Sequence, residues 1–266
     1  MASATSLITL LTDFGQRDYF VPSMKGVILG INSQARITDL SHDIAPQNIE
    51  QAAFYLKSCY HYFPDGTIHV VVVDPGVGSD RRALLVSTSR YFFLAPDNGV
   101  LSYIFEQELS VEVRVIENKQ YRLDSEGATF DGRDLFSPAA AWLTKGQVPG
   151  SYGPLVHNYV TLPKTEPRME NGKLVGKILY IDRFGNLISN ITPNDLETFR
   201  SVAKQEPATL RLGDLTITGI KTHYAEGALG LPESLINSNG QLEVFIRQGN
   251  AAERCECRVG QRIEVA

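Results

Sequence analysis

The stretch Val70–Arg82, which reads VVVVDPGVGSDRR, decides how the rest of the chain is interpreted. Four successive valines closed by Asp-Pro-Gly are typical of a buried strand that ends abruptly. Such runs belong to parallel strands that are covered on both faces. Open α/β sheets bind ligands in the crevice outside the carboxyl ends of their strands. We therefore expect Asp74, which ends this strand, to lie at a functional edge of a sheet.

A glycine-containing turn follows Asp74. Gly76 and Gly78 allow the backbone to approach a ligand closely. Arg81 is close enough in sequence to fold back over the turn and pair with Asp74. A carboxylate held beside a guanidinium makes these two residues the leading catalytic candidates. The competing interpretation is a loop with a structural salt bridge, because such pairs also occur away from active sites.

Composition limits the possible classes of protein. The chain has 266 residues, enough for two domains, and its net charge of −5 without a basic run argues against nucleic-acid binding. No apolar stretch approaches the roughly 18 residues of a membrane-spanning helix. The three cysteines are too few and wrongly spaced for a disulfide framework or a zinc site. With no secretory signal visible at the start, these features predict a cytoplasmic protein.

Strand and helix signals alternate through the first 160 residues. This alternation predicts a mostly parallel, Rossmann-like α/β domain over residues 1–160. Strands are expected at Ile8–Thr12, Ile37–Leu40, Val70–Val73, Leu84–Ser87, Tyr91–Leu94 and Val111–Ile116, and helices at Ser23–Ile31, Asn48–Cys59, Val100–Phe105 and Arg133–Leu143.

The helical signals fade after a proline-containing connection. Short strand-like runs separated by Gly and Asn predict a small all-β barrel over residues 161–266. The expected strands are Leu174–Ile181, Leu187–Ile191, Thr209–Leu212, Leu215–Ile220, Leu242–Ile246 and Arg262–Val265, with one helix at Pro193–Phe199.

Polar residues gather at several predicted strand ends in the first domain. Asp13 closes the first strand and Asp18 precedes the first helix. A carboxylate in such a place commonly accepts hydrogen bonds from ribose hydroxyls, whereas helix capping or a turn is the alternative. Asp131 lies just before a helix, where capping competes with a catalytic role.

The second domain carries its own candidates. In IDRFGNLISNI, Phe184 can stack on a base, Asn186 can bind an amide-like edge and Asp182 can hold an ammonium group. Ser238 and the pair Asn250-Ala251 flank a strand, where hairpin turns are the simplest interpretation. The five histidines show no metal-ligand spacing, so no metal site is expected.

Taken in order, six motifs carry a resemblance to a known family. They are LLTDFG, DPGVGSDRR, PDNG, TFDGRD, IDRFGNLISNI and QGNAAE. The series resembles the S-adenosyl-L-methionine (SAM) hydrolases, also called SAM hydroxide adenosyltransferases, which are related to the fluorinase and chlorinase enzymes. The resemblance implies a homotrimer that binds SAM between the N-terminal domain of one subunit and the C-terminal domain of its neighbour. SAM is then the substrate, and no cofactor is expected.

The resemblance also assigns roles to individual residues. Asp74 and Arg81 match two members of an Asp-Arg-His set that positions the attacking water, and Asp131 stands where the histidine is expected. The substrate-binding matches are Asp13 for the ribose, Asp18, Asp182 and Ser238 for the methionine part, and Phe184, Asn186, Asn250 and Ala251 for the adenine.

The aspartate at position 131 leaves alternatives open. An aspartate ordinarily has a pKa near 3.9, against about 6.5 for a histidine, and is therefore a weaker base at neutral pH. Hydrolysis of SAM to adenosine and L-methionine is the leading hypothesis. A non-catalytic SAM or adenosine binder is the alternative. A SAM-dependent halogenase is less favoured, because the carboxylates of Asp74 and Asp131 repel a halide.

Overall fold

A computed structural model describes residues 5–203 and 209–266. The chain divides into two compact units, Met1–Leu162 and Pro163–Ala266, and each is described by itself. Within the described ranges, no helix is long and apolar enough to cross a membrane.

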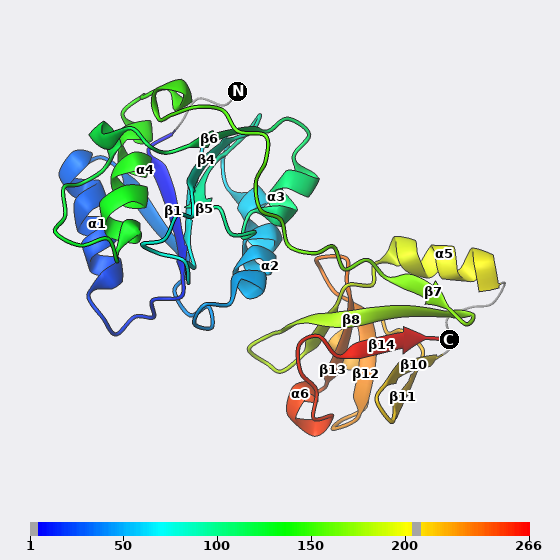
Figure 1. The fold of residues 1–266 in the computed structure, drawn as a ribbon. Coiled ribbons are helices and arrows are strands. Elements are labelled where there is room, and N and C mark those ends of the chain that lie inside the picture. Colours follow the sequence, from blue (N-terminus) through cyan, green and yellow to red (C-terminus); the bar gives the residue numbers. More distant parts are fainter. Residues whose placement is uncertain (1–4, 204–208) are drawn as a thin grey trace. The chain divides into compact units, whose positions relative to one another are not determined.

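Unit 1 is built on a six-stranded sheet with the order β2-β1-β3-β5-β4-β6 (Figure 1). The pairs β1/β2, β1/β3 and β3/β5 are parallel, whereas β4 runs antiparallel to both β5 and β6. The strands are β1 (Leu7–Thr12), β2 (Arg36–Ser41), β3 (Ile68–Val72), β4 (Ala83–Ser87), β5 (Phe92–Pro96) and β6 (Glu112–Val115). The α-helices are α1 (Phe20–Ile31), α2 (Ile49–Cys59), α3 (Ser102–Gln107) and α4 (Ser137–Thr144), with a π-helical turn at Gly132–Phe136 and 3₁₀ turns at Tyr60–Tyr62, Lys119–Tyr121 and Pro149–Ser151.

The valine strand β3 lies inside this sheet and is covered on both faces. Val70 and Val72 pack into a core with helices α1 and α4, while Val71 and Val73 pack into a second core with α2 and α3. Figure 1 shows these two pairs of helices on opposite sides of the sheet. Successive side chains of a strand point to opposite faces, so an uninterrupted run of valines fills both layers. The predicted α/β class is therefore confirmed.

Unit 2 is an antiparallel, nearly closed barrel with the strand order β11-β10-β14-β8-β9-β13-β12, and β7 pairs with β8. Closure is helped by the backbone N–H of Lys221, just after β11, which donates to the carbonyl of Ser234 in β12 at 2.7 Å. The strands are β7 (Arg168–Glu170), β8 (Lys173–Ile181), β9 (Leu187–Ser189), β10 (Thr209–Leu212), β11 (Leu215–Thr218), β12 (Pro232–Ile236), β13 (Leu242–Ile246) and β14 (Arg262–Val265). Its helices are α5 (Pro193–Ala203), α6 (Ala251–Arg254) and a 3₁₀ turn at Tyr224–Glu226.

Three local features differ from the sequence-based expectation. Strands β7 and β12 were not expected, since β7 is very short and β12 begins with a proline. Residues 132–136 form a π-helical turn before α4, where a single α-helix was expected. The hairpin turn expected at Asn250-Ala251 is wrong, because this pair begins helix α6. Ser238 does lie in the turn between β12 and β13.

Candidate active site

Two aspartates of unit 1 share one arginine just beyond the end of β3. The Nε of Arg81 donates to Oδ2 of Asp74 at 2.7 Å, and its Nη2 lies 2.5 Å from the same oxygen. The same Nη2 donates to Oδ2 of Asp131 at 2.5 Å. The side chains of Asp74, Arg81 and Asp131 are only 4%, 11% and 8% exposed. The predicted Asp74–Arg81 pair therefore forms, and it extends to the third candidate.

Glycines in the turn after Asp74 make this cluster possible. Gly78 has φ +81°, and a Cβ there would lie 2.9 Å from the carbonyl oxygen of Ala128. Only glycine allows both this left-handed backbone and such a close approach. The backbone N–H of Gly76 also donates to Oδ1 of Asp74 at 3.2 Å. The turn thus brings the chain around Ala128 and Asp131 against Asp74.

Asp131 does not cap the helix that follows it. Asp131 directly precedes the π-helical turn, and its own backbone has helical dihedral angles. Its side chain makes no capping hydrogen bond to that turn. Both of its oxygens face arginines instead, because Oδ1 accepts a 2.9 Å hydrogen bond from Nη2 of Arg122. The capping alternative is therefore wrong in this structure.

The cluster borders a cavity of about 330 Å³. Arg81, Arg122 and Asp131 are among its lining residues, together with Gly78 and Ser79. Sequence reasoning missed Arg122, because it lies in no motif and its nearest chemical partner is nine residues away. Carboxylate and guanidinium groups at such a cavity can orient a small polar molecule such as water.

Asp13 lies at the same edge of the sheet as Asp74. Thr12 of β1 pairs with Val72 of β3 in parallel register, so the residues after both strands emerge together. The Oδ2 atom of Asp13 accepts a hydrogen bond from the backbone N–H of Gln47 at 2.7 Å.

Asp18 is exposed in the loop before α1. It does not cap this helix, since Tyr19 occupies the N-cap position and the helix start has no side-chain cap.

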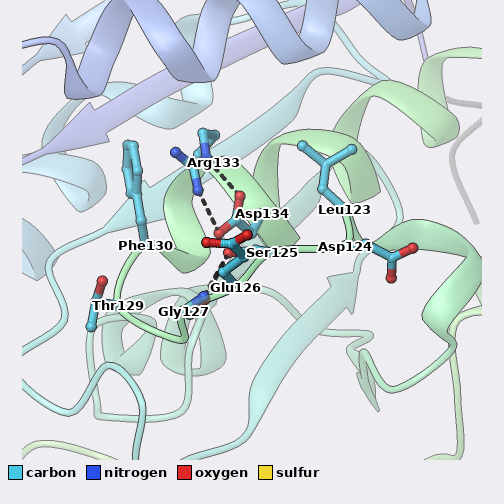
Figure 2. A pocket seen from close by; sticks show the side chains of 9 residues that line it. All are labelled: Leu123, Asp124, Ser125, Glu126, Gly127, Thr129, Phe130, Arg133 and Asp134. Carbon is cyan, nitrogen blue, oxygen red and sulfur yellow. Dashed lines mark hydrogen bonds and ion pairs between the residues drawn. The ribbon is translucent and has the colours of Figure 1, made fainter.

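A second cavity of unit 1, of about 440 Å³, is lined by nine residues between Leu123 and Asp134 (Figure 2). Arg133 lines it and donates to both oxygens of Asp134 at 2.6 and 2.9 Å. Its guanidinium also lies 5.1 Å from the ring centre of Phe130, and this ring meets Phe14 edge to face. This cavity therefore adjoins the segment after β1 that carries Asp13.

In unit 2, Asp182 organises the loop that carries two other candidates. Its Oδ1 accepts hydrogen bonds from the backbone N–H groups of Phe184 and Asn186 at 2.8 and 2.9 Å. Its Oδ2 accepts another from the Asn186 side chain at 2.9 Å. Asn186 is only 7% exposed, whereas Phe184 is 73% exposed. The ring of Phe184 is thus exposed on a loop whose backbone is fixed by hydrogen bonds to Asp182.

The segment after β13 packs against this loop. The side chain of Asn250 caps α6 by accepting from the backbone N–H of Glu253 at 3.0 Å. The backbone N–H of Ala252 donates to the carbonyl of Gly185 at 2.9 Å, and Ala251 is fully buried. Two motifs that are far apart in sequence are therefore joined in one place.

A cavity of about 600 Å³ opens beside this junction. Asp182, Phe184 and Asn186 line it, and so do Tyr224 and Phe245, which the sequence analysis did not identify. The two additional rings lie edge to face with centres 5.0 Å apart. Ser238 is exposed and is not among the lining residues.

A buried carboxylate supports the additional tyrosine. The hydroxyl of Tyr224 donates to Oε1 of Glu243 at 2.7 Å, and the side-chain amide of Asn237 donates to Oε2 at 3.0 Å. Glu243 is 2% exposed, and burial raises its pKa above the ordinary value. Burial raises the pKa of Tyr224 as well, so its hydroxyl remains a donor at neutral pH.

Across residues 5–203 and 209–266, no group of three or more His, Cys, Asp or Glu side chains is placed to hold a metal ion.

Comparison with known proteins identifies the family. Residues 8–153 match the SAM hydroxide adenosyltransferase N-terminal domain, and residues 176–264 match the C-terminal domain of the same family. The chain therefore belongs to the SAM hydroxide adenosyltransferase family.

Curated relatives span nearly the whole chain. An (R)-S-adenosyl-L-methionine hydrolase of Methanocaldococcus jannaschii is 31% identical over 97% of this chain and 95% of its own length. One of Thermus thermophilus is 29% identical over 97% and 98%. A fluorinase of an Actinoplanes species is more distant, with 26% identity over 91% of both chains.

A solved structure confirms the fold. An uncharacterised conserved protein of Thermotoga maritima has a TM-score of 0.88 and 32% identity, and the match covers 97% of this chain and 99% of the other.

Proposed function

We propose that the protein is a SAM hydrolase that uses water to split SAM into adenosine and L-methionine. The observation that carries this proposal is the buried Asp74–Arg81–Asp131 cluster beside a cavity. The relatives named (R)-S-adenosyl-L-methionine hydrolase support the same reaction. Those names specify the R configuration at the sulfonium sulfur, so we propose the R epimer as the substrate.

The proposed reaction is a direct displacement by water and needs no covalent bond between protein and substrate. A lone pair of the water oxygen forms the new bond to C5′ while the C5′–S bond breaks, and its electrons return to sulfur. The sulfonium becomes the neutral thioether of methionine, and the water releases one proton to solvent or to a carboxylate. The protein must align water, C5′ and sulfur and exclude competing water. A neutral leaving group needs no metal, and we propose that the enzyme requires neither metal nor cofactor.

Asp74 and Asp131 supply the acceptors that such a water needs. Each carboxylate has lone pairs that can accept its O–H groups, while Arg81 fixes both carboxylates through Nε and Nη2. Asp13 and Asp18 are proposed to hold the ribose and the methionine part. Phe184 is proposed to stack on the adenine.

The remaining candidates of unit 2 complete the proposed assignment. They are Asp182 and Ser238 for the methionine part, and Asn186, Asn250 and Ala251 for the adenine edge. We propose that these residues and those of unit 1 meet in a homotrimer, between neighbouring subunits. Light scattering tests this, because a monomeric active enzyme would contradict a shared site. The three cysteines are free thiols, which suits the proposed cytoplasmic location.

The decisive experiment identifies the products. Each epimer of SAM is incubated with the protein in halide-free buffer, and the incubation is repeated with chloride or fluoride. The products are then separated by chromatography and identified by mass spectrometry. Adenosine and methionine, formed from the R epimer and lost in Asp74→Ala, are the expected result. Intact bound SAM would indicate a binding protein. A 5′-halo-adenosine would indicate a halogenase.

The structure weakens the electrostatic argument against a halogenase. The carboxylates of Asp74 and Asp131 by themselves would repel a halide. Arg122 joins Arg81 at Asp131, however, so the formal charges of the cluster cancel. The charge of the cluster therefore does not exclude a halide as the nucleophile. The incubations with chloride and fluoride test whether one is used.

A further inference from the structure

The charge balance of the cluster singles out Arg122. Asp74 and Asp131 share the single guanidinium of Arg81, and all three side chains are almost completely buried. Two carboxylates around one arginine leave one formal negative charge without a partner, which is costly where water is scarce. The guanidinium of Arg122 supplies the missing positive charge at 2.9 Å from Oδ1 of Asp131.

The backbone on both sides of Arg122 is anchored. Tyr121 is 1% exposed and stacks on Tyr152, with ring centres 4.1 Å apart and planes 19° apart. On the other side, the backbone N–H of Leu123 donates to the carbonyl of Asp134 at 2.8 Å. The backbone from which the Arg122 side chain extends is therefore held on both sides.

The contacts divide the two oxygens of Asp131 between two arginines. Arg81 takes Oδ2 and Arg122 takes Oδ1, so the carboxylate plane is held from both ends. Removal of Arg122 leaves Asp131 held by Arg81 through Oδ2 alone, so that the carboxylate can pivot about this one contact. Misplacement of a water-orienting group by about 1 Å can cost about 100-fold in rate.

We propose that Arg122 is a positioning residue that holds and neutralises Asp131 and thereby makes an aspartate serviceable in this site. This inference rests on the proposed hydrolase function for its consequence in catalysis. Arg122 is 40% exposed and lines the cavity, so it forms the solvent-side wall of the cluster.

A double-mutant cycle between Arg122 and Asp131 tests the proposal. We expect Arg122→Gln to lower kcat about 10- to 100-fold with little change in KM, and Arg122→Lys to restore part of this loss. In an Asp131→Asn background, Arg122→Gln should have an effect of less than about threefold, because the charge it serves is gone. Equal effects of Arg122→Gln in both backgrounds, or none in either, would overturn the proposal.

Arg90→Gln is the matched control. Arg90 is 49% exposed and pairs with Asp65 at 2.7 Å. It lies after the end of β4, whereas Arg81 lies before its start. It should leave kcat and KM unchanged.

The same cycle measured by thermal unfolding does not depend on turnover. If Arg122 holds Asp131, the double variant loses less in Tm than the sum of the two single variants. Absence of this coupling, in an enzyme that does hydrolyse SAM, refutes the positioning role and leaves the proposed function standing. Coupling in a protein that does not turn SAM over refutes the function and supports the contact.

Discussion

The side chain of Asn250 occupies the space directly beside the α-carbon of Gly185. A Cβ built on Gly185 would lie 1.9 Å from the Oδ1 atom of Asn250, and the glycine has φ +81°. The loop with Phe184 and the segment after β13 are thus joined by a contact that only glycine permits.

Gly185→Ala is therefore expected to destabilise unit 2 and weaken substrate binding. The left-handed backbone alone costs about 1–2 kcal/mol for a residue with a Cβ, and displacement of Asn250 adds to this. Chemical unfolding and KM measure the two effects. Gly172→Ala is the control, because Gly172 has φ +76° and a Cβ there would meet no atom of residues 5–203 or 209–266 within 4 Å, so it carries only the backbone cost. Equal losses of stability in the two variants would show that the contact with Asn250 is unimportant.

Phe184→Ala tests whether the exposed ring binds the adenine. Stacking of a base on an aromatic ring is worth about 1–3 kcal/mol, so KM should rise about 5- to 150-fold. The melting temperature should hardly change, since the ring is 73% exposed and little packing is lost. Tyr62→Ala is the matched control, because Tyr62 is 71% exposed in unit 1. An unchanged KM in Phe184→Ala would remove this ring from the binding site.

Asp131→His tests the catalytic role of the aspartate through the pH–rate profile. A histidine ordinarily titrates near pH 6.5 and accepts a proton only in its neutral form. If the group at 131 acts on the water, kcat of the variant should rise as the pH passes from about 5.5 to 7.5. Profiles of identical shape in wild type and variant would place Asp131 outside the mechanism.

The buried imidazole of His69 is expected to make the stability of unit 1 depend on pH. Its Nδ1 lies 2.7 Å from the Thr9 hydroxyl, and its Nε2 is buried without a hydrogen-bond partner among the described residues. Burial lowers the pKa of His69 to about 3, below the ordinary 6.5 of an unfolded chain. Its neutral form is therefore favoured by folding. This contribution is complete above pH 6.5 and is lost as the pH falls toward 3.

Urea unfolding between pH 8 and pH 5 measures this effect. The free energy of unfolding should fall by up to about 1.4 kcal/mol per pH unit below pH 6.5 because of His69. His69→Gln should remove that part of the slope, whatever its effect on stability at pH 8. His223→Gln serves as the control, because His223 is 63% exposed. A slope that His69→Gln leaves unaltered would contradict this account.

The local pattern of the sequence was sufficient for most of the fold. The valines of β3, the alternation of strands and helices, and the glycines of the turn after Asp74 all report local burial and local backbone geometry. These properties depend on neighbouring residues, so a single sequence displays them. The pairing of Asp74 with Arg81 could be predicted for the same reason, since the turn between them is short.

Only the tertiary structure decided which distant residues meet. Arg81 is 50 residues from Asp131, and Tyr224 is 19 from Glu243, and no periodic pattern connects either pair. Arg122 and Tyr224 were missed because a side chain's partner depends on how separate elements pack, which hydrophobic periodicity does not record. The sequence by itself determined most of the elements, the family and most of the chemical groups. The packing of the elements decided that Asp131 faces two arginines instead of capping a helix.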